Sequence, residues 1–176
     1  MKFAILGNSG SGKSTLAARL AQEHGLAHLD LDTVAWESGQ VAVARDQEAA
    51  RGDVRRFCSE NAAWVVEGCY ASLVETALAF GPELVWLDLD VDTCVANCRA
   101  RPFEPHKFAS REEQDRHLEF LIAWVRGYGE RDGELGRREH VRLFDAYQGT
   151  KRVLQYGVVP KTAHLPRSSG PGADVR

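Results

Sequence analysis

The sequence predicts an α/β fold in which helices cover both faces of a parallel β-sheet. Short apolar runs of strand length alternate with longer amphipathic segments of helical length, as expected when a crossover helix follows each strand. The apolar runs are nearly continuous, which is typical of strands that are buried on both faces. A glycine-rich segment directly follows the first run, at the point where a strand would give way to a helix.

The individual elements follow from this alternation. Five strands are expected at residues 3–6, 27–31, 64–66, 84–89 and 152–156. Helices are expected after the first four strands, at residues 13–23, 47–60, 71–80 and 92–101. Two further helices are predicted at residues 111–128 and 134–147, and Gly149 would stop the second before the last strand. Asp92 is the residue expected to cap the helix at 92–101.

Composition limits the classes of function. The chain has 176 residues, of which 44% are hydrophobic and 27% charged, values typical of one compact globular domain. A formal net charge of −3 argues against non-specific binding of nucleic acid or of an anionic membrane. The N-terminal apolar run is too short for a signal peptide, and no segment approaches the ~20 apolar residues of a membrane span. We therefore expect a cytoplasmic protein, as a monomer or a homodimer.

The strongest functional signal is the pattern G-x-x-x-x-G-K-[ST] after the first strand. Glycines let the backbone wrap closely around a phosphate, and successive amides at a helix N-terminus then form an anion site. A dinucleotide-binding turn is disfavoured because Thr15 stands where its third glycine belongs. Lys13 would reach the β- and γ-phosphates of ATP, and Ser14 would bind Mg²⁺. The residues expected to bind nucleotide are Gly7, Asn8, Ser9, Gly10, Ser11, Gly12, Lys13, Ser14 and Thr15.

Carboxylates follow the second and third predicted strands. Asp30 and Asp32 end the second run, where ligands bind in open parallel sheets. Asp32 is a candidate to orient an acceptor hydroxyl and accept its proton, although a helix cap or a solvated turn would also explain both acids. Glu67 ends the third run and could hold Mg²⁺ through water, and Gly68 would let the backbone approach the γ-phosphate.

Two aromatic residues and four arginines complete the predicted site. Trp36 and Tyr70 are candidates to line the acceptor pocket, with core packing as the alternative for both. Two prolines make residues 102–110 a loop, and its position after a helix suits a lid. Arginines at the helix ends beside this loop could stabilise the charge of a transferring phosphoryl group, or could only favour the helix dipoles. These candidate catalytic arginines are Arg99, Arg101, Arg126 and Arg131.

Five ordered elements resemble a known family. They are the phosphate-binding segment, Leu31-Asp32-x-x-x-Trp36, Trp64-Val65-Val66-Glu67-Gly68-Cys69-Tyr70, Phe120-Leu121-Ile122-Ala123-Trp124 and Leu143-Phe144-Asp145-Ala146-Tyr147. Over residues 1–156 the chain resembles the adenylate-kinase-like P-loop proteins called topology modulation proteins, or FlaR-like proteins. The resemblance implies a three-layer P-loop NTPase fold with five parallel strands ordered 2-3-1-4-5. It also implies ATP and Mg²⁺ as cofactors and a mobile lid that carries arginines.

The chain departs from that pattern in one respect that bears on the substrate. Adenylate kinases usually carry an arginine soon after strand three, whereas here Glu67-Gly68 is followed by Cys69-Tyr70-Ala71-Ser72. The phosphate of a second nucleotide would lose its anchor unless another arginine replaced it; the candidates are Arg45, Arg51, Arg55 and Arg56. The Asp32 arrangement is also similar to that of shikimate and gluconate kinases.

We therefore predict an ATP-dependent phosphotransferase that acts on a small acceptor, with a hydroxyl favoured over a nucleoside monophosphate. A nucleotide-binding regulator with slow ATPase activity is the alternative from another class. The predicted domain covers residues 1–159, with a lid at about 102–110 and a flexible tail at 160–176.

Overall fold

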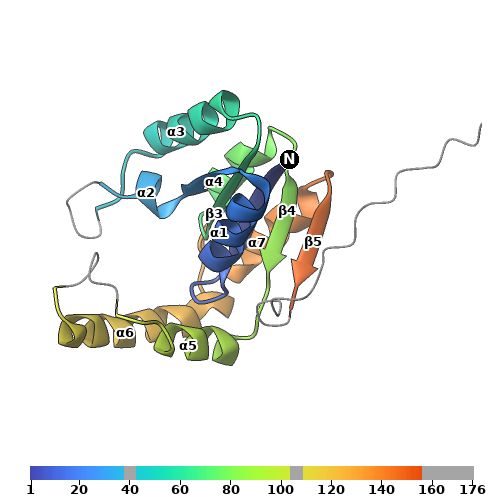
Figure 1. Cartoon of the computed structure of the whole chain (residues 1–176). Helices are drawn as coiled ribbons and strands as arrows, with labels where there is room; N and C mark the ends of the chain where they lie inside the picture. The colour runs from blue at the N-terminus through green and yellow to red at the C-terminus, as the bar shows by residue number, and fades with distance from the viewer. Residues whose placement is uncertain (38–42, 104–108, 156–176) are drawn as a thin grey trace, which may run out of the picture.

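A five-stranded parallel sheet forms the centre of the computed structural model, which describes residues 1–37, 43–103 and 109–155. The strand order is β2-β3-β1-β4-β5, which confirms the predicted 2-3-1-4-5 topology (Figure 1). The strands are β1 (Lys2–Gly7), β2 (Ala27–Asp30), β3 (Trp64–Gly68), β4 (Glu83–Leu87) and β5 (Lys151–Leu154). The predicted tail at 160–176, and residues 104–108 of the predicted lid, lie outside the described residues.

Helices cover both faces of the sheet and make a three-layer arrangement. One face packs against α3 (Gln47–Glu60), α4 (Ala71–Leu78) and α7 (Arg137–Ala146). The other packs against α1 (Lys13–His24), α5 (Val91–Arg99) and α6 (Arg111–Arg126). A short helix α2 (Asp32–Ala35) follows β2, and one 3-10 turn, η1 (Gly127–Gly129), extends α6.

The central strand shows why the apolar runs are continuous. Side chains on a strand point alternately to its two faces. Phe3 and Ile5 of β1 join the core beneath α1, whereas Ala4 and Leu6 join the core beneath α4. Both faces of the strand are buried, so each position from Phe3 to Leu6 is apolar.

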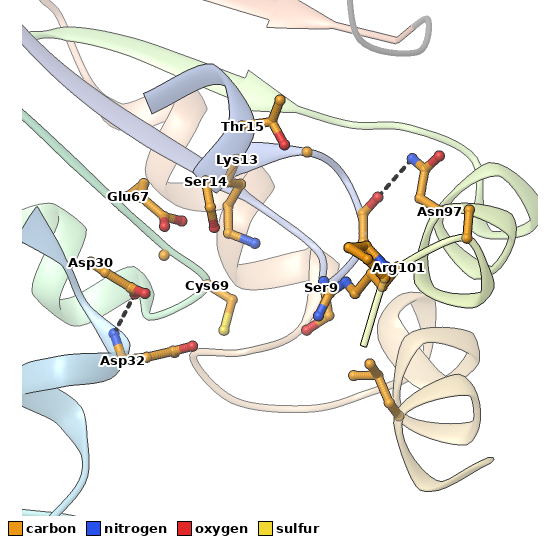
Figure 2. A pocket seen from close by; sticks show the side chains of 16 residues that line it. Ser9, Lys13, Ser14, Thr15, Asp30, Asp32, Glu67, Cys69, Asn97 and Arg101 are labelled. Atoms are coloured by element: carbon orange, nitrogen blue, oxygen red, sulfur yellow. Dashed lines mark hydrogen bonds between the residues drawn. The ribbon is translucent and has the colours of Figure 1, made fainter. Parts of the chain in front are cut away.

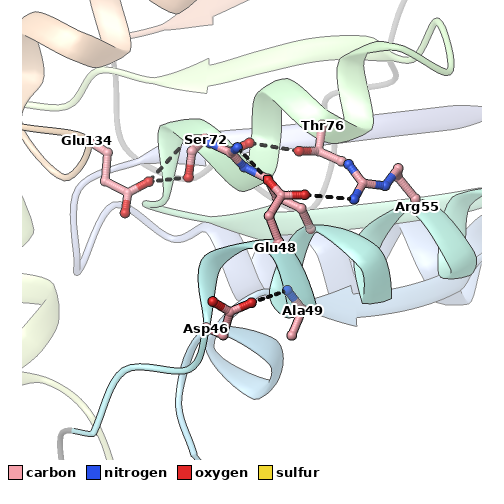
Figure 3. Close-up of polar contacts among 8 residues, drawn as sticks. Asp46, Glu48, Ala49, Arg55, Ser72, Thr76 and Glu134 are labelled. Atoms are coloured by element: carbon pink, nitrogen blue, oxygen red, sulfur yellow. Dashed lines mark hydrogen bonds and ion pairs between the residues drawn. The ribbon is translucent and has the colours of Figure 1, made fainter.

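Side chains cap the N-termini of α3, α5 and α6, and one of these caps differs from the predicted residue. Asp46 caps α3 by accepting a hydrogen bond from the Ala49 amide at 2.8 Å (Figure 3). The expected cap of α5 at Asp92 was wrong, because Asp92 lies inside the first turn. Asp90 is the cap: its backbone is extended, and its side chain accepts from the Thr93 amide at 2.8 Å. In a run of alternating aspartates, sequence alone does not fix which one stands at the last extended position.

Helix α4 is tied to the segment before α7. Glu134 accepts hydrogen bonds from both the amide and the hydroxyl of Ser72, at the N-terminus of α4 (Figure 3). A carboxylate is favourable there because helix N-termini carry unpaired amides and a partial positive charge. Within the described ranges, no helix has the length and apolar character that a bilayer crossing requires.

Candidate functional site

A cavity of about 620 Å³ opens at the carboxyl ends of β1, β2 and β3. Its wall consists of the loop between β1 and α1, the residues that end β2 and β3, and parts of α5 and α6 (Figure 2). This is the edge at which parallel α/β sheets bind ligands. The cavity brings together residues from most of the predicted groups, including Lys13, Asp32, Glu67 and Arg101.

The segment of residues 7–15, here called the phosphate loop, has the backbone shape that its glycines predict. Gly10 and Gly12 adopt positive φ angles of 78° and 91°, a conformation that favours glycine. A Cβ atom at Gly10 would lie 2.3 Å from the Cys94 carbonyl oxygen, so α5 leaves no room for a side chain. Helix α1 begins at Lys13 without a side-chain cap, which leaves its first amides available to an anion.

Two asparagines hold the phosphate loop against the neighbouring helices. The Asn8 side-chain amide donates to the Val125 carbonyl of α6 at 3.0 Å. The Asn97 side chain of α5 donates to the Gly10 carbonyl at 2.9 Å (Figure 2). Asn8 was predicted as a nucleotide-binding residue, but Asn97 was missed, and no sequence pattern distinguishes it from an ordinary helix residue. The loop is thus held in place by protein contacts alone.

Glu67 and Ser11 carry buried polar atoms that make no hydrogen bond to protein, as do Arg19 and Trp64. His28 Nε2 lies 4.0 Å from Glu67 Oε1. The Glu67 carboxyl is 2% exposed, and its Oε1 atom accepts no hydrogen bond. Burial raises the pKa of Glu67, although the nearby Lys13 ammonium and Ser14 hydroxyl act in the opposite direction. The Ser11 hydroxyl is likewise buried and unpaired. Unpaired buried polar atoms are rare in proteins, and of these residues Glu67 is the one that lines the cavity, where a ligand could supply the partner.

These features fit a nucleotide polyphosphate with Mg²⁺. The loop offers helix-terminal amides and Lys13 to phosphate oxygens. Ser14 and Glu67 offer oxygen atoms to a cation. Among the described residues, no group of three or more His, Cys, Asp or Glu side chains is placed to hold a metal. Mg²⁺ usually takes one or two protein ligands and completes its shell with phosphates and water.

Asp32 is held by a chain of hydrogen bonds that contains both predicted aromatic residues. Its Oδ1 atom accepts from the Tyr70 hydroxyl at 2.7 Å, and that hydroxyl accepts from Trp36 Nε1 at 2.6 Å. Burial and the adjacent Asp32 charge raise the pKa of Tyr70, so its hydroxyl stays a donor. Trp36 and Tyr70 do not line the cavity as predicted for an acceptor pocket. They stand behind Asp32 and fix its orientation.

Asp30 and Gly68 complete the edge formed by β2 and β3. The Asp30 side chain accepts from the Asp32 amide at 2.9 Å and lines the cavity with Asp32 (Figure 2). Gly68 also lines the cavity. It was predicted to let the backbone approach the γ-phosphate, and packing in the core gives a further reason for a glycine at this position. A Cβ atom there would lie 2.8 Å from Leu31 Cβ, in the core beneath α4.

Cys69 is a cavity residue that was not predicted. Its side chain points into the space bounded by Lys13 and Asp32 (Figure 2), and burial raises the pKa of the thiol to about 11. Its carbonyl oxygen lies 2.8 Å from His140 Nε2, while His140 Nδ1 lies 2.7 Å from the Tyr128 hydroxyl. His140 is fully buried, and burial lowers its pKa to about 4. A neutral imidazole therefore donates to the Cys69 carbonyl and accepts from Tyr128.

The four predicted catalytic arginines differ in position. Arg101 lines the cavity near Asn97 (Figure 2), whereas Arg99 and Arg126 are exposed at helix ends outside the lining. Arg131 donates to the carbonyl oxygens of Leu135 and Trp124, and its guanidinium lies 3.4 Å from the Trp124 ring centroid. Arg131 thus joins the end of α6 to the loop that follows. A catalytic role for these arginines stays a prediction.

The arginines considered as replacement phosphate anchors are engaged elsewhere. Glu48 of α3 pairs with two of them (Figure 3), and Asp53 of the same helix pairs with the other two. The four residues are Arg45, Arg51, Arg55 and Arg56. None of them contributes to the cavity wall.

Comparison with known proteins identifies the fold. No protein-family model matches the sequence, and no curated protein matches it significantly. A shikimate kinase from Bacteroides thetaiotaomicron superposes with a TM-score of 0.51 at 16% identity, over 88% of this chain and 86% of that one. The chain has a P-loop kinase-like fold. At 16% identity, the similarity to the shikimate kinase shows the fold alone. Membership of the topology modulation family stays a prediction.

Two other solved structures superpose with TM-scores below 0.5, and we draw nothing from them. A sugar kinase from Janibacter sp. HTCC2649 gives 0.47 at 15% identity, over 88% of this chain and 84% of that one. An uncharacterized protein from Eubacterium ventriosum ATCC 27560 gives 0.44 at 18% identity, over 88% and 89%.

Proposed function

We propose that the protein is an ATP-dependent phosphotransferase that moves the γ-phosphoryl group of ATP to a hydroxyl group of a small acceptor. One observation carries the proposal: a single cavity contains both a preformed phosphate loop and an oriented carboxylate, Asp32. A phosphate loop alone would support only nucleotide binding. The carboxylate supplies what a hydroxyl acceptor needs in addition, a group that positions it and receives its proton.

The donor side binds the triphosphate of ATP. Amides of the phosphate loop and the N-terminus of α1 bind phosphate oxygens, and Lys13 stabilises the charge on the transferring group. Lys13 Nζ now donates to the Asn8 carbonyl at 3.0 Å, so it is already directed along the loop. Ser14 and Glu67 would hold Mg²⁺, which when bound neutralises charge on the β- and γ-phosphates. Arg101 adds a positive charge where residues 102–110 are proposed to form a lid.

On the acceptor side, Asp32 receives a hydrogen bond from the acceptor hydroxyl and then its proton. The acceptor oxygen forms a bond to the γ-phosphorus as the bond to the bridging oxygen of ADP breaks, and ADP leaves with that electron pair. Tyr70 occupies Oδ1 of Asp32, which leaves Oδ2 for the acceptor. A nucleoside monophosphate is a weaker candidate, because none of the arginines considered as anchors for its phosphate lines the cavity.

The proposal is tested by replacing Lys13. Lys13→Ala should reduce ATP turnover by about 1,000-fold, since losing one preorganised charge-stabilising group costs rates of this order. Turnover is measured as ADP formation during a screen of sugars, amino alcohols, hydroxy acids and nucleoside monophosphates. Arg138→Ala removes the same charge from a side chain that is 88% exposed, and serves as the control. Undiminished turnover in a folded Lys13→Ala protein would contradict the proposal, and dependence on a protein partner would favour the regulator.

A further inference from the structure

The turn between β3 and α4 contacts a buried histidine of α7. His140 is fully buried, and its Nε2 atom lies 2.8 Å from the carbonyl oxygen of Cys69. A carbonyl oxygen can only accept a hydrogen bond, so Nε2 is the donor. The Tyr128 hydroxyl lies 2.7 Å from Nδ1, and it also receives a hydrogen bond from Trp86. Both ring nitrogens are therefore engaged, and the imidazole is held in one orientation.

The carbonyl that His140 binds belongs to the peptide unit that precedes Tyr70. A peptide unit is planar, so a hydrogen bond to its oxygen also fixes the direction in which the next residue continues. The Tyr70 backbone is extended at the last position before α4, with φ −88° and ψ 97°. Its side chain is 7% exposed, and its hydroxyl donates to Asp32 at 2.7 Å. The orientation of this peptide unit therefore determines where the hydroxyl meets Asp32, which lines the cavity with Cys69 (Figure 2).

The segment that leads to His140 also holds the other side of Tyr70. The Glu134 carbonyl accepts from the Ala71 amide at 3.3 Å, and the Glu134 carboxylate accepts from Ser72 (Figure 3). Residues 134–140 thus supply hydrogen-bond partners both before and after Tyr70 in the chain. The start of α4 and the turn before it are held against one segment of the protein.

Packing alone does not explain a histidine at position 140. Among the described residues, the buried polar or charged side chains are those of Asn8, Ser11, Glu67 and His140. The first two belong to the phosphate loop, and Glu67 lines the cavity, whereas His140 lies outside the cavity wall. The other buried residue of α7 is the apolar Leu143. Burying a polar side chain costs free energy unless its hydrogen bonds are made, so an apolar side chain would fill this place at lower cost.

We infer that His140 is a positioning residue for the acceptor carboxylate: it fixes the peptide unit before Tyr70, and Tyr70 in turn orients Asp32. This inference rests on the proposed function, in which Asp32 receives the proton of the acceptor hydroxyl. A misplacement of about 1 Å can lower a catalysed rate by up to about 100-fold, so loss of the hydrogen bond to Cys69 should lower kcat. The KM for ATP should not change, because His140 lies outside the cavity wall that holds the phosphate loop.

Two amide side chains at position 140 test the donor. The amide nitrogen of His140→Gln can reach the position of Nε2, whereas the shorter His140→Asn reaches only the position of Nδ1. ADP formation is measured with the most active compound of the acceptor screen. We expect kcat to fall about tenfold in His140→Asn and to stay within about twofold of wild type in His140→Gln, with the KM for ATP unchanged in both. Unchanged kcat in a folded His140→Asn protein overturns the inference.

Leu143→Ala is the control for a general loss of stability. Leu143 is 2% exposed on the same helix, so its truncation destabilises the fold without removing a hydrogen bond to Cys69. Assayed below its melting transition, this variant should keep the kcat of the wild type. A decrease equal to that of His140→Asn would assign the effect to loosened packing and overturn the inference. If His140→Asn does not fold, His140→Leu takes its place in every comparison.

A double variant tests the route through Tyr70. Tyr70→Phe already lacks the hydrogen bond to Asp32, so adding His140→Asn should lower kcat by at most about twofold more. A full additional decrease would show that His140 acts by another route, and would overturn the inference while the proposed function stands. If no compound raises ADP formation, the proposed function fails, and crystal structures of the ADP complexes decide about His140. Loss of the bond between Tyr70 and Asp32 in His140→Asn then supports its positioning role, and an intact bond overturns it.

Discussion

Acidification should destabilise the fold through a single buried histidine. His140 is fully buried, with both ring nitrogens hydrogen-bonded, one to the Cys69 carbonyl and one to the Tyr128 hydroxyl. Protonation would add a second proton to the ring, on the nitrogen that accepts from Tyr128, and would bury a positive charge whose cost the nearby Glu139 carboxylate offsets only in part. The Tyr128 hydroxyl also receives a hydrogen bond from Trp86 Nε1, so the whole chain favours the neutral ring.

The magnitude follows from the pKa of His140 in the two states. Burial lowers it from 6.5 to about 4 in the folded protein. Between these values the unfolded state binds more protons, so the free energy of unfolding falls as the pH falls. One pKa unit corresponds to about 1.4 kcal/mol. The contribution is fully present above pH 6.5, and about 3 kcal/mol of it is lost by pH 4.

Urea unfolding at pH 7.5, 6, 5 and 4.5 measures this loss. Other groups titrate in the same range, and the raised pKa of Glu67 acts with the opposite sign, so a reference protein is needed. His140→Gln keeps a donor and an acceptor but does not titrate. The difference between the two pH dependences therefore belongs to His140, and we expect the wild type to lose about 2–3 kcal/mol more than the variant. If the free energy of unfolding depended on pH in the same way in both proteins, His140 would not be the source of the loss.

Two further predictions concern the phosphate loop and the acceptor carboxylate. Tyr70→Phe removes the donor to Asp32 and should lower kcat about tenfold with little change in the KM for ATP, since a misplaced catalytic group costs rate. Tyr147→Phe is the matched change outside the cavity wall: it also removes one tyrosine hydrogen bond, to the Pro82 carbonyl, and should leave the kinetics unaltered. Equal kinetics for both variants would argue against the role of Tyr70. Gly10→Ala forces a methyl group against the Cys94 carbonyl in a positive-φ conformation, so the free energy of unfolding should drop by about 3 kcal/mol. A thermal melt unchanged from wild type would show that α5 can move away.

Much of the fold was predictable because it depends on short-range pattern. Strand and helix positions follow from apolar periodicity, and the strand order follows from the family resemblance. The phosphate loop was predictable because one short segment of the sequence determines its backbone shape and also contains the groups expected to bind phosphate. The capping of α5 shows the limit of such reasoning, since Asp90 and Asp92 satisfy the same composition rule and only the backbone distinguishes them.

The parts of the site that were missed depend on contacts between distant segments. Asn97 lies 87 residues from Gly10, and His140 lies 71 residues from Cys69. Nothing in the sequence around either residue of these pairs indicates which distant residue it contacts. Tyr70 was predicted to line the acceptor pocket, and from the sequence its side chain could equally have faced an acceptor or a neighbouring acid. Its hydroxyl reaches Asp32 only because β2 and β3 lie side by side.

The anchoring of the phosphate loop by Asn97 has a thermodynamic consequence for nucleotide binding. A loop that must be ordered by its ligand uses part of the binding energy to restrict its own backbone. Here the Gly10 carbonyl accepts a hydrogen bond from Asn97 of α5, and the Asn8 side chain donates one to the Val125 carbonyl of α6. The conformational entropy of this segment is therefore lost during folding. Nucleotide affinity should then depend mainly on contacts with the phosphates, and little on chain ordering.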